Sequence, residues 1–153
     1  EAPPEPEDKV KPAELCEAEL STVQAGAKIA FEPGSATVSG DSRETIDAIV
    51  EILAECGEPR LEIQGHTDSR KIAPGTQKIY PTNWELSAAR ATAAVRELIE
   101  QGIPATQMQA VGYADTRPLQ SEKTAAAYQA NRRIEVILLP NQFKTKVLGQ
   151  SDS

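Results

Sequence analysis

The chain has 153 residues and a formal net charge of −7 at pH 7, a length that suits one domain. Apolar residues make up 39% of the chain, which is enough for one hydrophobic core. No apolar run approaches the roughly 18 residues of a membrane span, and no basic stripe typical of nucleic-acid binding is visible. We therefore expect one domain, with neither a membrane span nor nucleic acid as a partner.

The negative charge is concentrated at the N-terminus. Residues 1–20 hold seven acids and two bases, whereas the rest of the chain holds sixteen acids and fourteen bases. Residues 1–12 are acidic and rich in proline, so we expect a disordered linker there. Because the chain begins with Glu1 rather than Met, we expect an upstream membrane-embedded or lipid-anchored segment that is absent here. Residues 140–153 are polar, and we expect a flexible tail.

The first expected elements are a helix over residues 13–24 and a strand over residues 27–31. The helix places Cys16, Leu20 and Val23 at helical spacing, and the strand alternates apolar and polar side chains. A second helix follows Asp41, which forms a capping-box pattern with Glu44. Its apolar stripe consists of Ile46, Ile49, Val50 and Leu53 and continues to Cys56.

The two cysteines are Cys16 and Cys56. The absence of a CxxC motif and the single histidine argue against a zinc site, and we expect no metal or cofactor. Two lone cysteines fit either free thiols or one disulfide. We favour the disulfide because both residues lie on apolar stripes. It would tie the N-terminal helix to the domain and stabilise it by roughly 4 kcal/mol.

The remaining elements alternate between strands and helices. Residues 60–65 form a strand, and residues 69–81 are an insert whose Pro74-Gly75 pair indicates a loop. Thr82 and Glu85 begin a helix that runs to about Gln101. Strands over 107–113 and 134–139 flank a short helix at 121–130, and the last strand is apolar on both faces and should be interior. The long helix should bury Trp84, Ala88, Ala91, Val95, Leu98 and Ile99, with Arg90 at the edge of this stripe.

This order, β-α-β-α-β-(α)-β, predicts an α/β (α+β) fold. We expect a two-layer sandwich in which a mixed four-stranded sheet carries helices on one face. Four short motifs then occur in order: Gly65–Ser69, Leu86–Ala91, Val111–Tyr113 and Asn131–Val136. Together, and in this strand and helix context, they closely resemble the OmpA-like domain family over about residues 27–139. That family includes domains of porin-like proteins, peptidoglycan-associated lipoproteins and flagellar stator proteins.

The resemblance implies non-covalent binding of peptidoglycan through the diaminopimelate of its stem peptide. The position that matches the family's acid is Asp68, which would pair with the ligand's ammonium, and Arg90 would clamp its carboxylate. His66 is expected to be structural, and Trp84 to pack rather than bind. The other positions that match the family's pocket are Phe31, Thr67, Asn83, Leu86 and Arg132.

The resemblance also implies a periplasmic domain of a Gram-negative envelope protein. The full-length protein would be attached to the outer membrane rather than the inner one, and a homodimer is possible. The fourteen residues between Asp68 and Asn83 look more like the stator branch, which would anchor a motor to the wall. Taken singly, Asp68 fits a turn residue and Arg90 a solvated helix residue. A wall hydrolase needs a nucleophile with a base, a metal or two carboxylates, and none is apparent, so we expect no enzyme. An envelope protein as the ligand is the remaining alternative.

Overall fold

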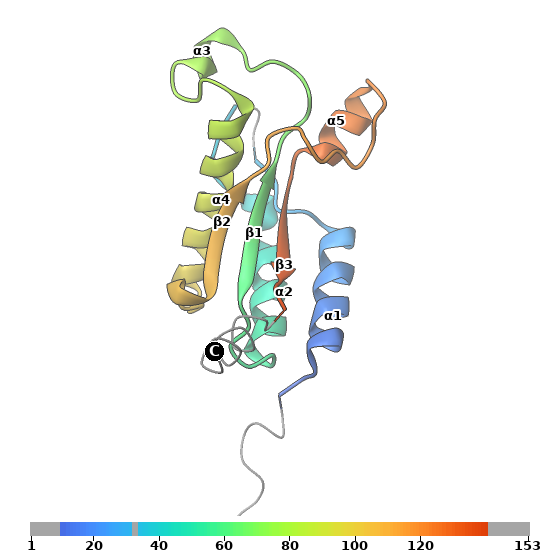
Figure 1. Ribbon diagram of the computed structural model, residues 1–153, viewed down its shortest axis with the longest axis vertical. Helices are drawn as coiled ribbons and strands as arrows, with labels where there is room; N and C mark the ends of the chain where they lie inside the picture. The colour runs from blue at the N-terminus through green and yellow to red at the C-terminus, as the bar shows by residue number, and fades with distance from the viewer. Residues whose placement is uncertain (1–9, 32–33, 141–153) are drawn as a thin grey trace, which may run out of the picture.

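The computed structural model describes residues 10–31 and 34–140, and Figure 1 shows how their elements are arranged. Residues 1–9 of the expected linker, residues 32–33 and residues 141–153 of the expected tail lie outside the described residues. Short 3₁₀ turns precede α2 and β2. The named elements are α1 (Ala13–Gly26), α2 (Arg43–Ala54), β1 (Leu61–His66), α3 (Pro74–Gln77), α4 (Asn83–Glu100), β2 (Met108–Gly112), α5 (Ala125–Asn131) and β3 (Arg133–Leu138).

The sheet has the order β2-β1-β3, so β1 is its central strand. β1 runs parallel to β2, with Gly65 opposite Gly112, and antiparallel to β3, with His66 opposite Arg133. The long helices lie on one face of this mixed sheet, with α2 and α4 behind it in Figure 1 and α4 against β1 and β2. The predicted α/β fold class is therefore confirmed.

The expected four-stranded sheet is wrong by one strand. Residues 27–31 contribute only isolated bridges, from Ile29 to Ile134 and from Phe31 to Val38. The backbone of Ala30 bonds elsewhere: its N–H donates to Ser42 Oγ (2.7 Å), and its carbonyl accepts from Ser39 N (3.0 Å). A segment whose backbone groups are satisfied by a turn cannot also form a continuous ladder.

The expectation of an interior β3 also needs correction. β3 pairs along its length with β1 alone, and beyond the single bridge at Ile134 its outer edge is covered by α1. There the side-chain amide of Gln24 donates to the carbonyl of Val136 (3.0 Å) and accepts from its N–H (2.7 Å). The apolar residues of β3 are thus buried by a helix that also satisfies part of the strand edge.

Two glycines allow α4 to lie close against the sheet. A Cβ atom on Gly65 of β1 would stand 2.1 Å from the carbonyl oxygen of Ser87, and one on Gly112 of β2 would stand 2.6 Å from Ala88 N. Ser87 Oγ also accepts a hydrogen bond from Ala114 N (3.0 Å), just beyond β2. This contact fixes the position of α4, and therefore of Arg90, relative to the end of β1.

The buried face of α4 differs from the expected one. The residues that the helix buries are Leu86, Ser87, Arg90, Ala91, Ala94 and Leu98, whereas Trp84 is 54% exposed and Ile99 is also exposed. The expectation that Trp84 packs in the core is therefore wrong. The Thr82–Glu85 capping box is confirmed. The Asp41–Glu44 box is not, because α2 begins at Arg43 after a 3₁₀ turn.

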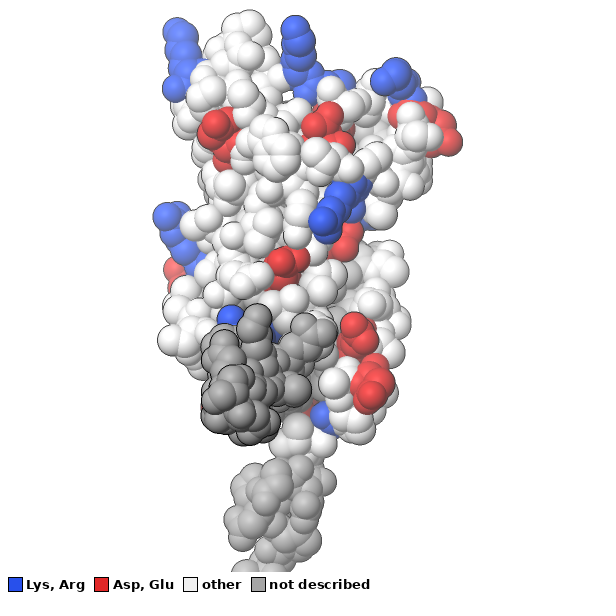
Figure 2. All heavy atoms as spheres, viewed as in Figure 1, with Lys and Arg blue, Asp and Glu red and all other residues white. Residues whose placement is uncertain are grey.

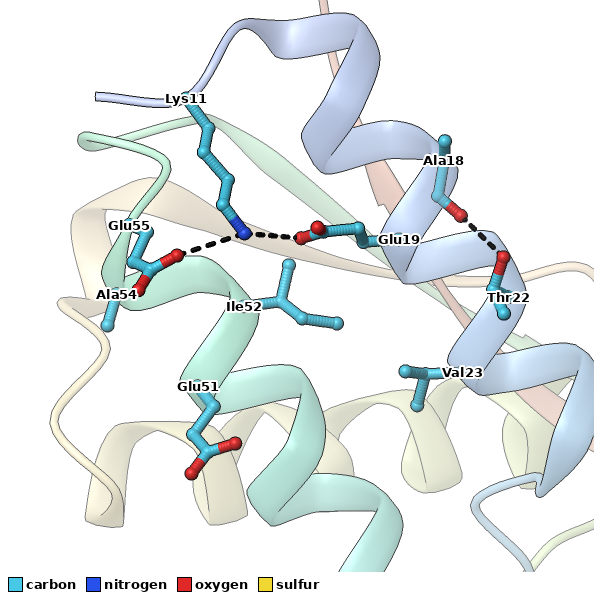
Figure 3. A pocket seen from close by; sticks show the side chains of 9 residues that line it. All are labelled: Lys11, Ala18, Glu19, Thr22, Val23, Glu51, Ile52, Ala54 and Glu55. Carbon is cyan, nitrogen blue, oxygen red and sulfur yellow. Dashed lines mark hydrogen bonds and ion pairs between the residues drawn. The ribbon is translucent and has the colours of Figure 1, made fainter. Parts of the chain in front are cut away.

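The N-terminal helix is joined to the domain by the expected disulfide between Cys16 and Cys56. Its neighbour Lys11 adds a second link: Lys11 Nζ contacts Glu19 (2.8 Å) on α1 and Glu55 (2.9 Å) at the end of α2. Figure 3 shows this lysine between the two carboxylates at one end of a groove between α1 and α2. No described helix is both long and apolar enough to span a bilayer.

Candidate functional site

The C-terminal end of β1, the first turns of α4 and the insert enclose a cavity of about 280 Å³. This end of the molecule also carries α3 and α5, and most basic side chains on the face drawn in Figure 2 gather there. Six of the seven predicted ligand residues line the cavity: Thr67, Asp68, Asn83, Leu86, Arg90 and Arg132.

Asp68 is held in place by three sets of hydrogen bonds. Its residue is only 6% exposed, and its Oδ1 accepts from the backbone N–H of Arg70 (2.9 Å). Its Oδ2 accepts from the guanidinium of Arg70 (2.9 and 3.2 Å) and from Arg132 Nη1 (2.6 Å). Burial raises the pKa of the Asp68 carboxyl, but the bonds from both arginines outweigh this, and the net pKa lies below its usual range. Asp68 is therefore an anion at neutral pH.

Arg90 is a buried cation on the opposite wall of the cavity. It is 3% exposed, its Nε donates to the carbonyl of Ser35 (2.8 Å), and its guanidinium lies 5.2 Å from the ring centre of Phe31. Burial, together with the nearby charge of Arg132, lowers the pKa of Arg90 to about 10. The group stays charged at neutral pH, and the two arginines repel each other across the cavity.

The other predicted residues shape the cavity or its rim. Asn83 Nδ2 donates to the carbonyls of Asp68 (3.4 Å) and Arg70 (3.3 Å), and so links the first turn of α4 to the loop after β1. Thr67 Oγ1 also donates to the Asp68 carbonyl (3.0 Å), and Leu86 supplies a buried apolar wall. Phe31 does not line this cavity. It contacts the Arg90 guanidinium and lines a second, neighbouring cavity.

Arg70, on the insert, is a further residue of the cavity rim, and its side chain is 53% exposed. Besides bonding to Asp68, the Arg70 guanidinium lies 4.7 Å from the ring centre of Tyr128 on α5. Arg70 therefore spans the cavity rim from the insert to α5. A signal for it was present, because an aspartate after a strand commonly accepts from the N–H two residues later.

The insert forms the outer rim of the cavity rather than part of the core. It is a loop with one helical turn, α3, and all of its residues are exposed or half-buried. It contributes Arg70, Lys71, Ile72, Ala73 and Thr76 to the lining. Ile79, the large apolar residue at the end of this insert, is 69% exposed.

His66 lies outside the cavity. It is buried, stacks on Tyr113 with ring centres 5.4 Å apart, and its Nε2 pairs with Gln64 Oε1 (3.0 Å). Burial, with a smaller effect of the Arg133 charge, lowers the pKa of His66 to about 4, so the ring is neutral at pH 7. Within residues 10–31 and 34–140, no group of three His, Cys, Asp or Glu side chains is placed to hold a metal ion.

The larger groove between α1 and α2, about 810 Å³, is a poorer candidate. Its only cation, Lys11, is already paired with Glu19 and Glu55, and Val23 and Ile52 lie between the two helices. None of the predicted ligand residues lines it. The smaller cavity, in which an anion and several cations converge, is the candidate site.

The pattern of the OmpA family matches residues 30–132, which is more than half of the chain and includes every lining residue of the cavity. The chain belongs to the OmpA family. This membership confirms the resemblance drawn from the four motifs, and the match begins just before Phe31 and ends at Arg132.

The chain is similar to several individual members of this family. The chain is 37% identical over 123 residues to motility protein B of Escherichia coli, covering 79% of this chain and 38% of that protein. It is 29% identical to the peptidoglycan-associated lipoprotein of Rhizobium meliloti, covering 76% of this chain and 62% of that one. The solved structure of the cell wall anchor of the T6SS from Pseudomonas aeruginosa superposes with a TM-score of 0.63 at 29% identity, covering 72% of this chain and 76% of that one. The chain thus spans less than two thirds of either relative.

Proposed function

We propose that this domain binds peptidoglycan without catalysis, through the diaminopimelate of the stem peptide. The observation that carries the proposal is a cavity in which the ionised Asp68 faces the buried cation Arg90 and the partly buried cation Arg132. Diaminopimelate that is built into the stem peptide through one end, and is not cross-linked, presents an ammonium and a carboxylate on one carbon at the other end. The names of the lipoprotein relative and of the cell wall anchor support this reading.

Arg90 and Arg132 are suited to the carboxylate of this ligand. Arg90 loses hydration by burial and is repelled by Arg132, and both effects lower its pKa. A carboxylate placed between the two guanidinium groups would relieve the repulsion and accept charge-assisted hydrogen bonds. In a partly desolvated cavity such bonds are stronger than in water. The site is therefore ready for an anion before the ligand arrives.

Asp68 is suited to the ammonium, but it must exchange a partner. Its Oδ2 is occupied by Arg70 and Arg132. The side chain of Arg70 is 53% exposed and that of Arg132 only 25%, so Arg70 returns to water at little cost. We infer that the ligand's ammonium displaces Arg70 from Asp68, while Arg132 stays between the acid and the ligand's carboxylate.

The same geometry gives little support to hydrolysis. A glycoside hydrolase needs two carboxylates that flank the bond, and Asp68 is the only acid among the described residues that line the cavity. His66, the only histidine, is turned away and bonded to Gln64. We therefore propose a binding domain. We also propose that the full-length protein belongs to the cell envelope and faces the periplasm, in a role like that of a wall anchor or of a stator protein.

Sedimentation with purified sacculi tests the proposed function. The protein should co-sediment with sacculi whose stem peptides contain diaminopimelate, and free meso-diaminopimelate should release it. Sacculi that carry lysine at the same position should retain far less, because lysine lacks the second carboxylate. Equal retention on both wall types, or no release by diaminopimelate, would instead point to another ligand such as an envelope protein.

A further inference from the structure

A second cavity of about 470 Å³ adjoins the proposed diaminopimelate site. Its polar lining consists of Lys28, Gln129 and Arg132, and its apolar lining of Phe31 and three alanines, two of them on α5. It opens beside the segment that the sequence assigned to a first strand. Among the residues that the structure describes, no acid contributes to this lining.

The side chains of Arg132 and Phe31 lie between the two cavities. Arg132 lines each of them and reaches Asp68 through its Nη1 (2.6 Å). Phe31 lines the second cavity, while its ring lies 5.2 Å from the Arg90 guanidinium that lines the first. A ligand group seated between Arg90 and Arg132 therefore lies next to the second cavity, and the residue covalently attached to it can enter there.

The cations of the second cavity have hydrogen-bonding capacity to spare. Among residues 10–31 and 34–140, Lys28 Nζ has no ion-pair or hydrogen-bond partner. The Arg132 guanidinium donates only to Asp68 within the same part of the chain, so Nε and Nη2 remain available. Two positive groups that line one cavity with an aromatic ring and alanine methyl groups suit a carboxylate carried on a short aliphatic chain.

We propose that this second cavity binds a carboxylate of the stem-peptide residue next to the diaminopimelate. The inference rests on the proposed function and adds a second anchoring point, made by Lys28 and Arg132. In the stem peptide, the glutamate that precedes diaminopimelate is linked through its side chain and keeps a free α-carboxylate. The domain would thus recognise two adjacent residues of the peptide rather than diaminopimelate alone.

Calorimetry with two soluble ligands tests this. The ligands are free meso-diaminopimelate and a disaccharide tetrapeptide, the latter prepared with either glutamate or its α-amide before the diaminopimelate. We expect Lys28→Ala to weaken binding of the acid tetrapeptide about three- to tenfold, as expected for one charge-assisted bond at a half-exposed site. Binding of free diaminopimelate should not change. The matched control is Arg96→Ala, which removes an exposed charge on α4 that lines neither cavity.

The outcomes separate the two proposals. If the wild-type protein prefers the acid tetrapeptide over its amide, and Lys28→Ala abolishes that preference, the second cavity binds the glutamate carboxylate. A loss with Lys28→Ala that is equal for acid and amide supports the same cavity with the terminal alanine carboxylate as its ligand. Unchanged tetrapeptide binding by Lys28→Ala overturns the inference and leaves the diaminopimelate site standing. If the wild-type protein binds neither ligand, the proposed function fails, and the inference fails with it.

Discussion

Reduction of the Cys16–Cys56 disulfide should destabilise the domain by a predictable amount. The bond joins residues 40 positions apart and ties α1 to the end of α2. On the chain-entropy estimate, opening a loop of this length increases the entropy of the unfolded chain and costs about 4 kcal/mol of stability. For a domain of this size, that corresponds to a melting temperature about 10–15 °C lower. The ion pair of Lys11 with Glu55 bridges the same elements, but an exposed pair compensates little.

The assay is denaturant unfolding followed by circular dichroism, with and without a phosphine reductant. A Cys16→Ala/Cys56→Ala variant serves as the matched control, because its stability must not respond to the reductant. Alanine is preferred to serine because Cys16 is buried in the core, where a hydroxyl would lack a partner. If reduction changes the free energy of unfolding by less than about 1 kcal/mol, the loop-entropy reasoning does not hold for this chain.

Three further results are expected. Gly65→Ala should lower the free energy of unfolding by more than about 3 kcal/mol or prevent folding, because its Cβ would stand 2.1 Å from the Ser87 carbonyl oxygen. The control in the same unfolding assay is Gly75→Ala, whose Cβ meets nothing within 4 Å. The folded pKa of His66 is lowered from 6.5 to about 4, so between these pH values only the unfolded chain takes up a proton on this residue. The contribution of His66 to stability should therefore fall by up to about 3 kcal/mol as the pH drops from 6.5 to 4 and change no further below that; a His66→Gln variant with the same pH dependence over this range would contradict this. Arg70→Ala should tighten tetrapeptide binding, measured by calorimetry, about two- to fivefold, because it removes the group that competes with the ligand's ammonium for Asp68. The control variant Lys71→Ala should not tighten binding. Equal weakening by the two substitutions would show that Arg70 only attracts the ligand by its charge.

The sequence pattern predicts the fold class well, because the strands and helices each have a clear apolar period. β1 buries its apolar residues Leu61 and Ile63 as expected, although its last three residues are buried too, and α2 buries its Ile46, Ile49 and Leu53 stripe. The expected first strand failed for a non-local reason: Ser42, twelve residues away, takes the backbone N–H of Ala30. Such a competition between a side chain and a ladder leaves no trace in the apolar period.

The face of α4 shows a second limit of reasoning from hydrophobicity. The helix rests on Gly65 and Gly112, so small residues such as Ser87 and Ala91 meet the sheet, and the large Trp84 is left outside. Close backbone approach favours small side chains whatever their polarity. A ranking by apolar size therefore selects the wrong face of this helix.

Motif resemblance, rather than the chemistry of single residues, predicts the candidate site. Asp68 and Arg90, taken singly, suit a turn and a solvated helix, and the structure shows that Asp68 does accept the turn N–H of Arg70. The structure adds that Arg90 is buried and that Arg70 and Arg132 share one carboxylate oxygen. These contacts depend on how the insert and α5 approach each other, which loop sequence does not specify.

The most direct measurement of the central claim pairs one change in the protein with one change in the ligand. Wild type and Arg90→Gln are titrated by calorimetry with tetrapeptides that carry either diaminopimelate or lysine, which differ by the carboxylate assigned to Arg90. We expect Arg90→Gln to lose about 2–5 kcal/mol of binding to the diaminopimelate peptide. Its binding to the lysine peptide should change by less than about 0.5 kcal/mol, with folding checked by circular dichroism. An equal loss for both peptides would show that Arg90 does not hold that carboxylate.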